Sequence, residues 1–237
     1  MYLRINGDDY GMTESCSRAI AEALARGLIT HATVMATGEW FDEAAALAAE
    51  SGFCDRLGIH FNLTQGRPLT RDICGVKAFV RDGCFHKDYL RQPRQLSEAE
   101  RRAVLAELSA QVERLKRAGI TPAHADSHHY IHTFLYLAPL VASVCREQGI
   151  SRVRLDRTFD TSSRPRVTEG RIDNGWWRKQ GFVTTAHFGR MSDIVPGQVP
   201  DDTEIMVHPD YDKNGVLIDR TGMKDGFPAG EPPARLL

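Results

Sequence analysis

The chain has 237 residues, of which 42% are hydrophobic, so it is long enough for one α/β domain with a substantial core. Thirty basic residues nearly balance thirty-one acidic ones, and no Lys- or Arg-rich run is concentrated enough to follow a nucleic-acid backbone. No apolar run approaches the roughly 18 residues that a membrane span needs, and the amino-terminal MYLRINGDDYG is too polar for a signal peptide. We therefore expect a soluble, cytoplasmic protein.

Short apolar runs alternate with segments of helical periodicity, which is typical of parallel strands joined by crossover helices. The expected strands are residues 2–5, 29–36, 56–63, 122–127, 151–155 and 203–208. The expected helices are residues 13–26, 41–52, 97–118 and 134–149, with Thr13 as an N-cap and Ser97 and Glu100 as a capping box. With about seven strands, the pattern fits either an open doubly wound sheet or a (β/α) barrel.

Residues 64–96 are rich in Gly, Pro and Arg and show no clear period. We expect a long loop or lid here, and not a linker between domains. Because this segment follows directly on the strand that carries His60, we predict that it borders the pocket. The whole chain, residues 1–237, is then a single domain with an insertion at about 64–96. No element is predicted between Asp156 and residue 203.

Polar clusters stand directly after four of the expected strands. They are GDDYG from Gly7, HFNLT from His60, HADSHHYIH from His124 and HPDYD from His208. Because the carboxyl ends of parallel strands gather on one side in both architectures, these clusters should converge there. The five cysteines include no C-x-x-C pair, so any metal at this place would have nitrogen and oxygen ligands.

The cluster HADSHHYIH puts four histidines and one aspartate into nine positions. Along an extended strand, His124, Asp126 and His128 share one face, and three coordinating groups on one face are a metal-site geometry. His132 could rejoin the site if the chain turns into the following helix. The alternative is a structural strand end whose histidines cap the next helix or meet water.

Two further clusters supply a carboxylate pair and a lone imidazole. Asp8 and Asp9 are adjacent, so one could ligate a metal while the other acts as a base, although such a pair also occurs as a turn with an N-cap. His60 interrupts an apolar run, which fits either a buried core residue or a ligand. A carboxylate and two imidazoles from three strand ends would leave a hydrolytic metal open to water and substrate.

The remaining candidates lie late in the chain. His208 ends the last expected strand, where it could serve as a general acid or bond to backbone. Arg154 ends the strand 151–155 and is a candidate for contact with the substrate. Trp176, Trp177 and Phe188 could form an aromatic floor for a sugar ring or belong to the core.

The motifs N-x-DD-[FY]-G, G-[IM]-H-F-x-L-T-x-G-x-P-L, H-x-DSHH-x-x-H and HP-x-Y occur in this order between Asn6 and about Tyr211. In this the chain resembles the YdjC-like family of carbohydrate deacetylases, whose best-known members deacetylate chitooligosaccharides. The resemblance implies a deformed (β/α) barrel and hydrolysis of an N-acetyl group on an amino sugar or short N-acetylated oligosaccharide. It also implies one divalent metal ion, Mg or Zn, with Mn or Co as alternatives.

The resemblance assigns roles residue by residue. The metal ligands would be Asp9, His60 and His128, the catalytic base Asp8 and the general acid His208. His124, Asp126 and His132 would orient the ligands or contact the substrate.

The chain departs from the family pattern in two places. Gly7 and Tyr10 stand where Ala and Phe are usual, which we expect to alter the substrate pocket without touching the ligands. After HPDYDKNG, the sequence DRTGMKDGFPAGEPPARLL shows no closing helix of the kind usual in the family. We therefore expect a barrel that is incomplete, shortened, or closed by a partner subunit in a homodimer.

Two other functions compete with deacetylation. A metal-dependent hydrolase of a phosphoester or a cyclic amide could use the same barrel, and a phosphate substrate would favour arginines such as Arg67, Arg71 and Arg154 near the site. A non-catalytic sugar- or metal-binding protein is the third possibility, and it would not need Asp8 beside a ligand.

Overall fold

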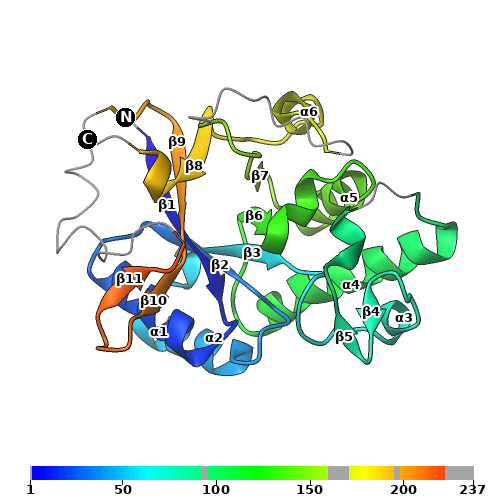
Figure 1. Cartoon of the computed structure of the whole chain (residues 1–237), viewed down its shortest axis with the longest axis horizontal. Helices are drawn as coiled ribbons and strands as arrows, with labels where there is room; N and C mark the ends of the chain where they lie inside the picture. Colours follow the sequence, from blue (N-terminus) through cyan, green and yellow to red (C-terminus); the bar gives the residue numbers. More distant parts are fainter. Residues whose placement is uncertain (1, 92–94, 160–170, 195–197, 222–237) are drawn as a thin grey trace.

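Seven parallel strands form one curled sheet in the order β7-β6-β3-β2-β1-β9-β8. The structure, a computed structural model, describes residues 2–91, 95–159, 171–194 and 198–221. The strands are β1 (Leu3–Tyr10), β2 (His31–Val34), β3 (Leu57–Phe61), β6 (His124–Ser127), β7 (Arg152–Val153), β8 (His187–Arg190) and β9 (Thr203–Val207). The predicted single α/β domain with a deformed barrel is confirmed (Figure 1).

The two edges of the curled sheet are joined by backbone hydrogen bonds. The amide of Thr158, just beyond β7, donates to Phe188 O in β8 at 2.9 Å, and the amide of Val153 donates to Val183 O at 3.0 Å. The seven strands therefore form a curled, partly closed sheet whose two edges meet through these few bonds. The predicted absence of a closing helix concerns residues 222–237, which lie outside the described part of the chain.

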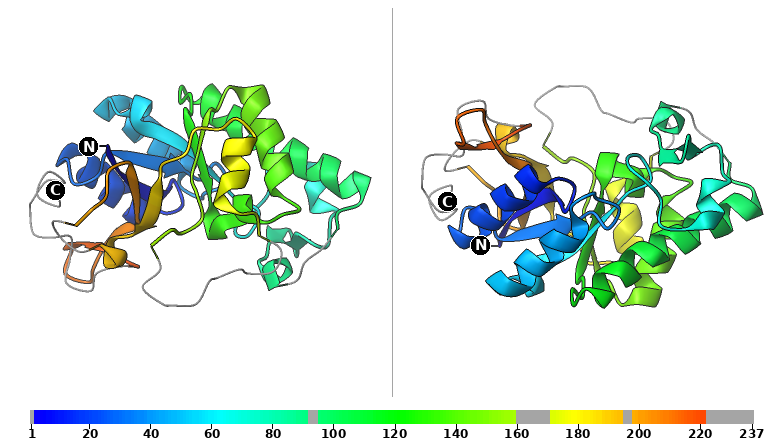
Figure 2. Two further views of the ribbon diagram at one scale, coloured as in Figure 1. Left: turned by 90° about the horizontal axis from the view of Figure 1, so that it is seen from above. Right: turned by 90° about the horizontal axis from the view of Figure 1, so that it is seen from below.

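Helices lie around the outside of the sheet (Figure 2). They are α1 (Glu14–Ala25), α2 (Phe41–Ser51), α4 (Glu98–Arg117), α5 (Ala138–Gln148) and α6 (Asn174–Lys179), with short 3-10 helices η1 (Cys54–Arg56), η3 (His128–Thr133) and η4 (Met191–Asp193). Thr13 caps α1, and Ser97 with Glu100 forms the predicted capping box of α4. Among the described residues, no helix is both long and apolar enough to cross a bilayer.

The outward face of β1 packs on the helices. A Cβ at Gly7 would lie 2.9 Å from Ile29 Cδ1 and 3.3 Å from Ile20 Cγ1, so the side chain that another residue would add here points to the helical layer. Tyr10 is fully buried and donates its hydroxyl to Ala44 O in α2 at 2.7 Å. Our expectation that Gly7 and Tyr10 shape the substrate pocket is therefore wrong, because both face the helical layer.

The segment 64–96 is more structured than a loop. It contains α3 (Arg71–Cys74), the antiparallel pair β4 (Val80–Arg81) and β5 (Cys84–Phe85), and the 3-10 helix η2 (Asp88–Arg91). Its polar anchor is Glu107 of α4, which accepts hydrogen bonds from the amides of Leu69 and Thr70. Most of the described segment therefore packs on α4 at the side of the barrel, and the lid role remains a prediction.

Two other regions differ from expectation. The helix expected from residue 134 begins only at Ala138, because the chain first makes the 3-10 turn η3, and Pro139 fits the first turn of the helix that follows. Beyond Asp156, no pattern in the sequence indicates α6 or β8. A hairpin of β10 (Pro209–Tyr211) and β11 (Leu217–Asp219) packs beside α1 (Figure 1).

Candidate active site

The carboxyl end of β1 directs two adjacent carboxylates to the same side. In a regular strand, Asp8 and Asp9 would point to opposite faces. The pairing of β1 with β2 is irregular between Gly7 and Tyr10, and Asp9 has a φ of 73°, in the left-handed region that Asp reaches more readily than most residues. This bulge turns the Asp9 side chain into the barrel, so both carboxylates line one pocket.

Asp9 meets two imidazoles there. Its Oδ1 lies 3.2 Å from His60 Nε2 and 2.9 Å from His128 Nδ1, and all three side chains are buried. Burial alone would raise the pKa of Asp9, but the neighbouring His128 and His60 rings hold that pKa well below its usual range. Asp9 is therefore a carboxylate at neutral pH, ready to ligate a cation.

The orientation of His60 is fixed from behind. Its Nδ1 lies 2.7 Å from Asp126 Oδ1, which leaves Nε2 facing Asp9. Thr33 Oγ1 donates to Asp126 Oδ2 at 3.0 Å and holds that carboxylate in place. Such a carboxylate behind a histidine is the usual arrangement around a metal-binding imidazole.

Asp9, His60 and His128 could hold a metal ion, since their ligand atoms lie within 4.8 Å of one another. Within the described residues, Asp9 Oδ1 and His60 Nε2 are buried, and although Asp9 Oδ1 lies close to both rings, neither atom makes a hydrogen bond of good geometry. Buried polar atoms are rarely left without partners, so a cation between them would satisfy both. One carboxylate oxygen and two imidazole nitrogens suit a borderline divalent ion.

A second group of possible ligands, Asp8, His60 and Asp126, is already neutralised. The guanidinium of Arg154 lies 2.6 Å from Asp8 Oδ2 and 2.6 Å from Asp126 Oδ2. Its Nε also donates to Glu204 Oε1 at 2.6 Å. Arg154 thus occupies the place of a cation in this group, and the group containing Asp9 is the better candidate for metal.

Asp8 and His208 complete the polar lining. Burial alone would raise the pKa of Asp8, but Arg154 outweighs this effect and lowers that pKa below its usual value. Burial lowers the pKa of His208, although the charges of Asp8 and Asp9 act in the opposite direction. His208 Nδ1 lies 2.8 Å from Thr221 Oγ1, which orients the ring. At neutral pH the pocket therefore holds an ionised Asp8 beside a neutral His208.

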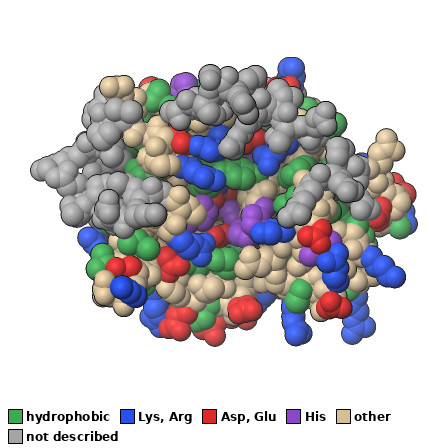
Figure 3. Space-filling model, viewed as in Figure 1, with side chains coloured by type: hydrophobic (Ala, Val, Ile, Leu, Met, Phe, Trp, Pro, Cys, Tyr) green, Lys and Arg blue, Asp and Glu red, His purple; other side chains and the backbone are tan. Residues whose placement is uncertain are grey.

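These groups line a pocket of about 350 Å³. Its lining residues are Asp8, Asp9, His60, Ser127, His128, His129, Tyr130, Arg190, Met206, His208, Arg220 and Thr221. Figure 3 shows histidine side chains gathered at the centre of the face presented there, with acidic and basic groups around them. The predicted convergence of the four sequence clusters is therefore found in the structure.

Several predicted contact residues lie away from this pocket. His124 lies lower in the barrel, with Nε2 3.3 Å from Asn6 Oδ1, and His132 is fully buried with Nε2 3.2 Å from Arg154 O. Asp126 and Arg154 are buried behind His60 and Asp8. The contacts of these four side chains support the site from behind.

The aromatic floor is not found. Trp177 and Phe188 are fully buried in the core, and Trp176 packs edge-on against Trp177 with ring centroids 4.9 Å apart. Phe188 instead lies beneath the Arg154 guanidinium at 4.9 Å. These rings support the barrel and do not line the pocket.

Other pocket residues were missed by the sequence analysis. Arg220 follows β11 and donates to Asp9 Oδ2 at 3.0 Å, and Arg190 lies at the end of β8. Tyr130 and His129 reach the pocket through consecutive left-handed φ angles of 57° and 54°. No motif marks the two arginines, whereas His129 belongs to the histidine-rich cluster, although regular strand alternation would put it on the face opposite to His128.

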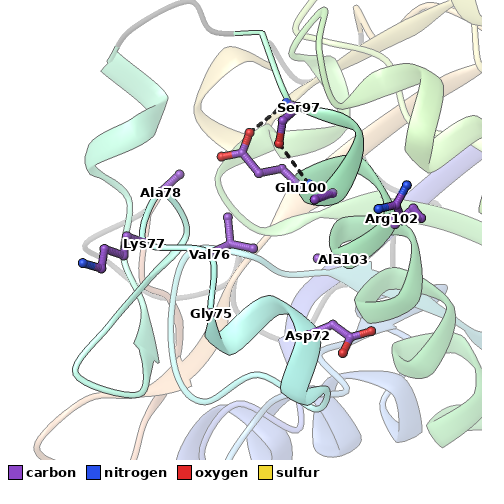
Figure 4. Close-up of a pocket in the computed structure, with 10 residues that line it drawn as sticks. Asp72, Gly75, Val76, Lys77, Ala78, Ser97, Glu100, Arg102 and Ala103 are labelled. Atoms are coloured by element: carbon purple, nitrogen blue, oxygen red, sulfur yellow. Dashed lines mark hydrogen bonds between the residues drawn. The ribbon is translucent and has the colours of Figure 1, made fainter.

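A larger, open hollow of about 970 Å³ lies between the segment after α3 and the start of α4 (Figure 4). Ser97 and Glu100, which line it, are engaged in the capping box of α4. Arg102 and Asp72 also border the hollow. It contains no group of buried, convergent polar side chains like the pocket at the strand ends.

Comparisons with known proteins bear on the fold and the family of this chain. A crystal structure from Enterococcus faecalis, of a proposed cellobiose-phosphate cleavage protein, matches the fold with a TM-score of 0.69 and 20% identity, covering 99% of this chain and 90% of that one. A chitooligosaccharide deacetylase from Escherichia fergusonii is 31% identical over 226 residues, 90% of this chain and 83% of that protein. The family described as YdjC-like protein matches residues 2–229. The chain therefore belongs to the YdjC-like family.

Proposed function

We propose that this protein is a metal-dependent deacetylase that hydrolyses the N-acetyl group of an amino sugar or a short N-acetylated oligosaccharide and releases acetate. The observation that carries the proposal is the arrangement of Asp9, His60 and His128 around one point, with Asp8 and His208 on the same pocket wall. The similarity to a chitooligosaccharide deacetylase supports the choice of substrate class.

Asp9, His60 and His128 would hold one divalent ion, Mg or Zn, with Mn or Co as alternatives for the same donors. Such an ion supplies Lewis acidity toward an amide carbonyl and acidifies a bound water. The nitrogen and oxygen donors do not decide among these metals. Metal analysis of the purified protein would do so.

Asp8 is the proposed base. Arg154 and Asn6 both donate to its oxygens, which fixes the carboxylate and keeps it ionised at neutral pH. An ionised carboxylate at the pocket wall can accept the proton of an attacking water. Its lowered pKa makes it a weak base, so it fits a reaction whose water is already acidified.

His208 is the proposed acid toward the departing amine. It faces the same pocket as Asp8, on the neighbouring strand end of β9. Because its pKa is lowered, the ring begins neutral and must gain a proton before it can donate one. Transfer of the proton first taken by Asp8 would meet this need and leave both groups as they started.

The pocket volume suits a small ligand. About 350 Å³ lies at the lower end of the range for small-molecule sites, which extends from roughly 300 to 1,000 Å³. We therefore propose that one or two sugar rings enter the pocket and that further rings extend outside it. Thr64 and Gln65 contact His129 and His128, so the start of segment 64–96 is the part that would border the substrate.

The decisive experiment measures acetate release from N-acetylated mono- and oligosaccharides by the metal-loaded protein. Asp8→Asn should lower turnover by about 10²–10⁴-fold and keep its metal, since a general base contributes this much. Asp9→Asn should lose metal affinity and activity together. Asp42→Asn, whose side chain is 79% exposed and lies on α2, is the control and should change neither.

Each outcome separates the proposal from a rival. Full activity in both site variants would refute the assignment, and loss of metal by Asp8→Asn would exchange the two roles. Metal binding without turnover of any acetylated sugar would favour a non-catalytic binding protein. Turnover of a phosphoester or a cyclic amide in its place would favour the other hydrolases. The cytoplasmic location and the homodimer stay predictions.

A further inference from the structure

A group of basic side chains lies at the opposite end of the barrel from the pocket. Along β1, Arg4 shares a face with Asn6 and Asp8, so its side chain points into the barrel near the amino-terminal ends of the strands. Arg4 is only 5% exposed. Its Nε and Nη1 are buried and have no hydrogen-bond partner within the described residues.

The nearest internal counter-ion is already engaged. Arg4 is the register partner of Glu204 across the β1–β9 pairing, so their side chains lie on the same face of the sheet. Glu204 Oε1, however, accepts from Arg154 Nε at 2.6 Å. Across the part of the chain that the structure describes, no carboxylate forms an ion pair with Arg4.

The surroundings of Arg4 add positive charge. Arg152 begins β7, where it is the register partner of His124, and its guanidinium lies 5.5 Å from the centre of the Tyr2 ring. Within the described residues it too lacks an ion pair. The rings of His31 and His124 meet edge-on at 5.5 Å. Burial, together with the charge of Arg4, lowers the pKa of His31 to about 4, so this ring is neutral at physiological pH.

A buried guanidinium without a counter-charge is costly, and buried arginines are as a rule paired. The planar fork of N–H groups matches the two oxygens of a carboxylate or a phosphate. We propose that Arg4 and Arg152 bind a small oxyanion, of the size of inorganic phosphate or acetate, at the amino-terminal mouth of the barrel, with His31 beside it. This anion site is separate from the catalytic pocket.

The anion site is connected to the pocket through the barrel interior. His124 lies against Asn6 Oδ1 at 3.3 Å, and Asn6 Nδ2 donates to Asp8 Oδ1 at 2.8 Å. A change at Arg4 could therefore alter turnover indirectly. For this reason the test measures binding through stability, and it does not depend on the proposed deacetylase activity.

The experiment follows the melting temperature of the full-length protein as sodium phosphate, sodium sulfate or sodium acetate is added at constant ionic strength. A ligand at 100 times its Kd should raise the melting temperature by about 5–11 °C in a chain of this size. Arg4→Met and Arg152→Met should each lose most of this rise. Arg220→Met, which removes a guanidinium from the catalytic pocket, should retain it and so exclude binding there.

Far-UV circular dichroism checks that each variant is folded. If Arg4→Met does not fold, Arg152→Met alone tests the anion site, because the Arg152 side chain is only partly buried and its replacement should be tolerated. A rise with phosphate and sulfate alone indicates a tetrahedral oxyanion, and a rise with acetate indicates a carboxylate. The proposal would be overturned if none of the three anions changed the melting temperature of the wild type. It would also be overturned if the anions raised the melting temperatures of the Arg4 and Arg152 variants as much as that of the wild type.

Discussion

Replacement of Arg154 by Met should be among the most destabilising single changes in this protein. The arginine side chain is 2% exposed and lies 2.6 Å from each of three carboxylates, those of Asp8, Asp126 and Glu204. Removing one partner of a buried ion pair costs about 3–5 kcal/mol, because the charge left behind has no compensation. Here three such charges remain, so we expect at least this loss out of a total of roughly 5–15 kcal/mol.

The assay is urea unfolding followed by circular dichroism at pH 8 and pH 5. With an m-value of about 2–3 kcal/mol/M, the midpoint at pH 8 should fall by about 1–2.5 M. Arg154 lowers the pKa of Asp8, so without it burial raises that pKa above the unfolded value. The folded variant then binds protons more readily than the unfolded chain, and its deficit should be smaller at pH 5 than at pH 8.

Two further variants make the test specific. Adding Asp126→Asn and Glu204→Gln to Arg154→Met removes two of the buried carboxylates that the arginine no longer neutralises. This triple variant should recover part of the lost free energy of unfolding. Arg18→Met is the matched control, because Arg18 pairs with Glu14 on the surface, where both side chains are more than half exposed. Its effect should stay within about 0.5 kcal/mol. An Arg154→Met variant within 1 kcal/mol of wild type at pH 8, roughly the limit for a surface pair, would refute the reasoning.

Two substitutions, one pH dependence and one metal-binding measurement test separate parts of the structure. Gly58→Ala should cost about 1–3 kcal/mol in urea unfolding, since its Cβ would lie 2.5 Å from the His124 ring; unchanged stability would show that the ring can move. Burial alone would lower the pKa of His60, but Asp126 outweighs this effect and raises the pKa to about 10. In the metal-free protein, the stability that the protonated His60 contributes should therefore be fully present below about pH 6.5. This contribution should be lost as the pH rises through about 10, which urea unfolding at a series of pH values would measure. Metal binding at pH 7 should then release about one proton per chain, which calorimetry in buffers of different ionisation enthalpy would detect or exclude. Ser97→Ala should cost about 0.5–2 kcal/mol by loss of the α4 cap, and thermal unfolding would measure it.

The sequence predicted those features that follow from local rules. Alternating apolar runs and helical segments indicated a parallel α/β sheet, and the resemblance to a known family favoured a barrel over an open sheet. Capping residues such as Thr13 and Ser97 marked where helices begin. The polar residues after the strands indicated a common site because parallel strands end on one side. Topology brought these residues to one side of the sheet, and the irregular backbone at Asp9 then turned its carboxylate toward the two imidazoles.

Features that depend on tertiary contacts could not be predicted in this way. Arg220 reaches Asp9 from a hairpin 211 positions away in sequence, and β8 is a strand only through its pairing with β9. Arg154 was expected to contact the substrate, whereas it is buried behind Asp8 and does not line the pocket. Its carboxylate partners lie on three other strands, and no local pattern indicated these contacts. One local signal was overlooked, since Asp82-Gly83 forms the two-residue turn of the β4–β5 hairpin with positive φ at both positions.

The left-handed backbone at Asp9 limits how the proposed metal site could be redesigned. A φ of 73° is open to Asp, Asn and Gly at low cost, whereas Glu would lose roughly 1–2 kcal/mol there. Glu would also carry its carboxylate one methylene farther, beyond the point between His60 and His128. An engineer who seeks a different metal preference should therefore vary the two histidines, because the backbone at this position restricts the acidic ligand to aspartate.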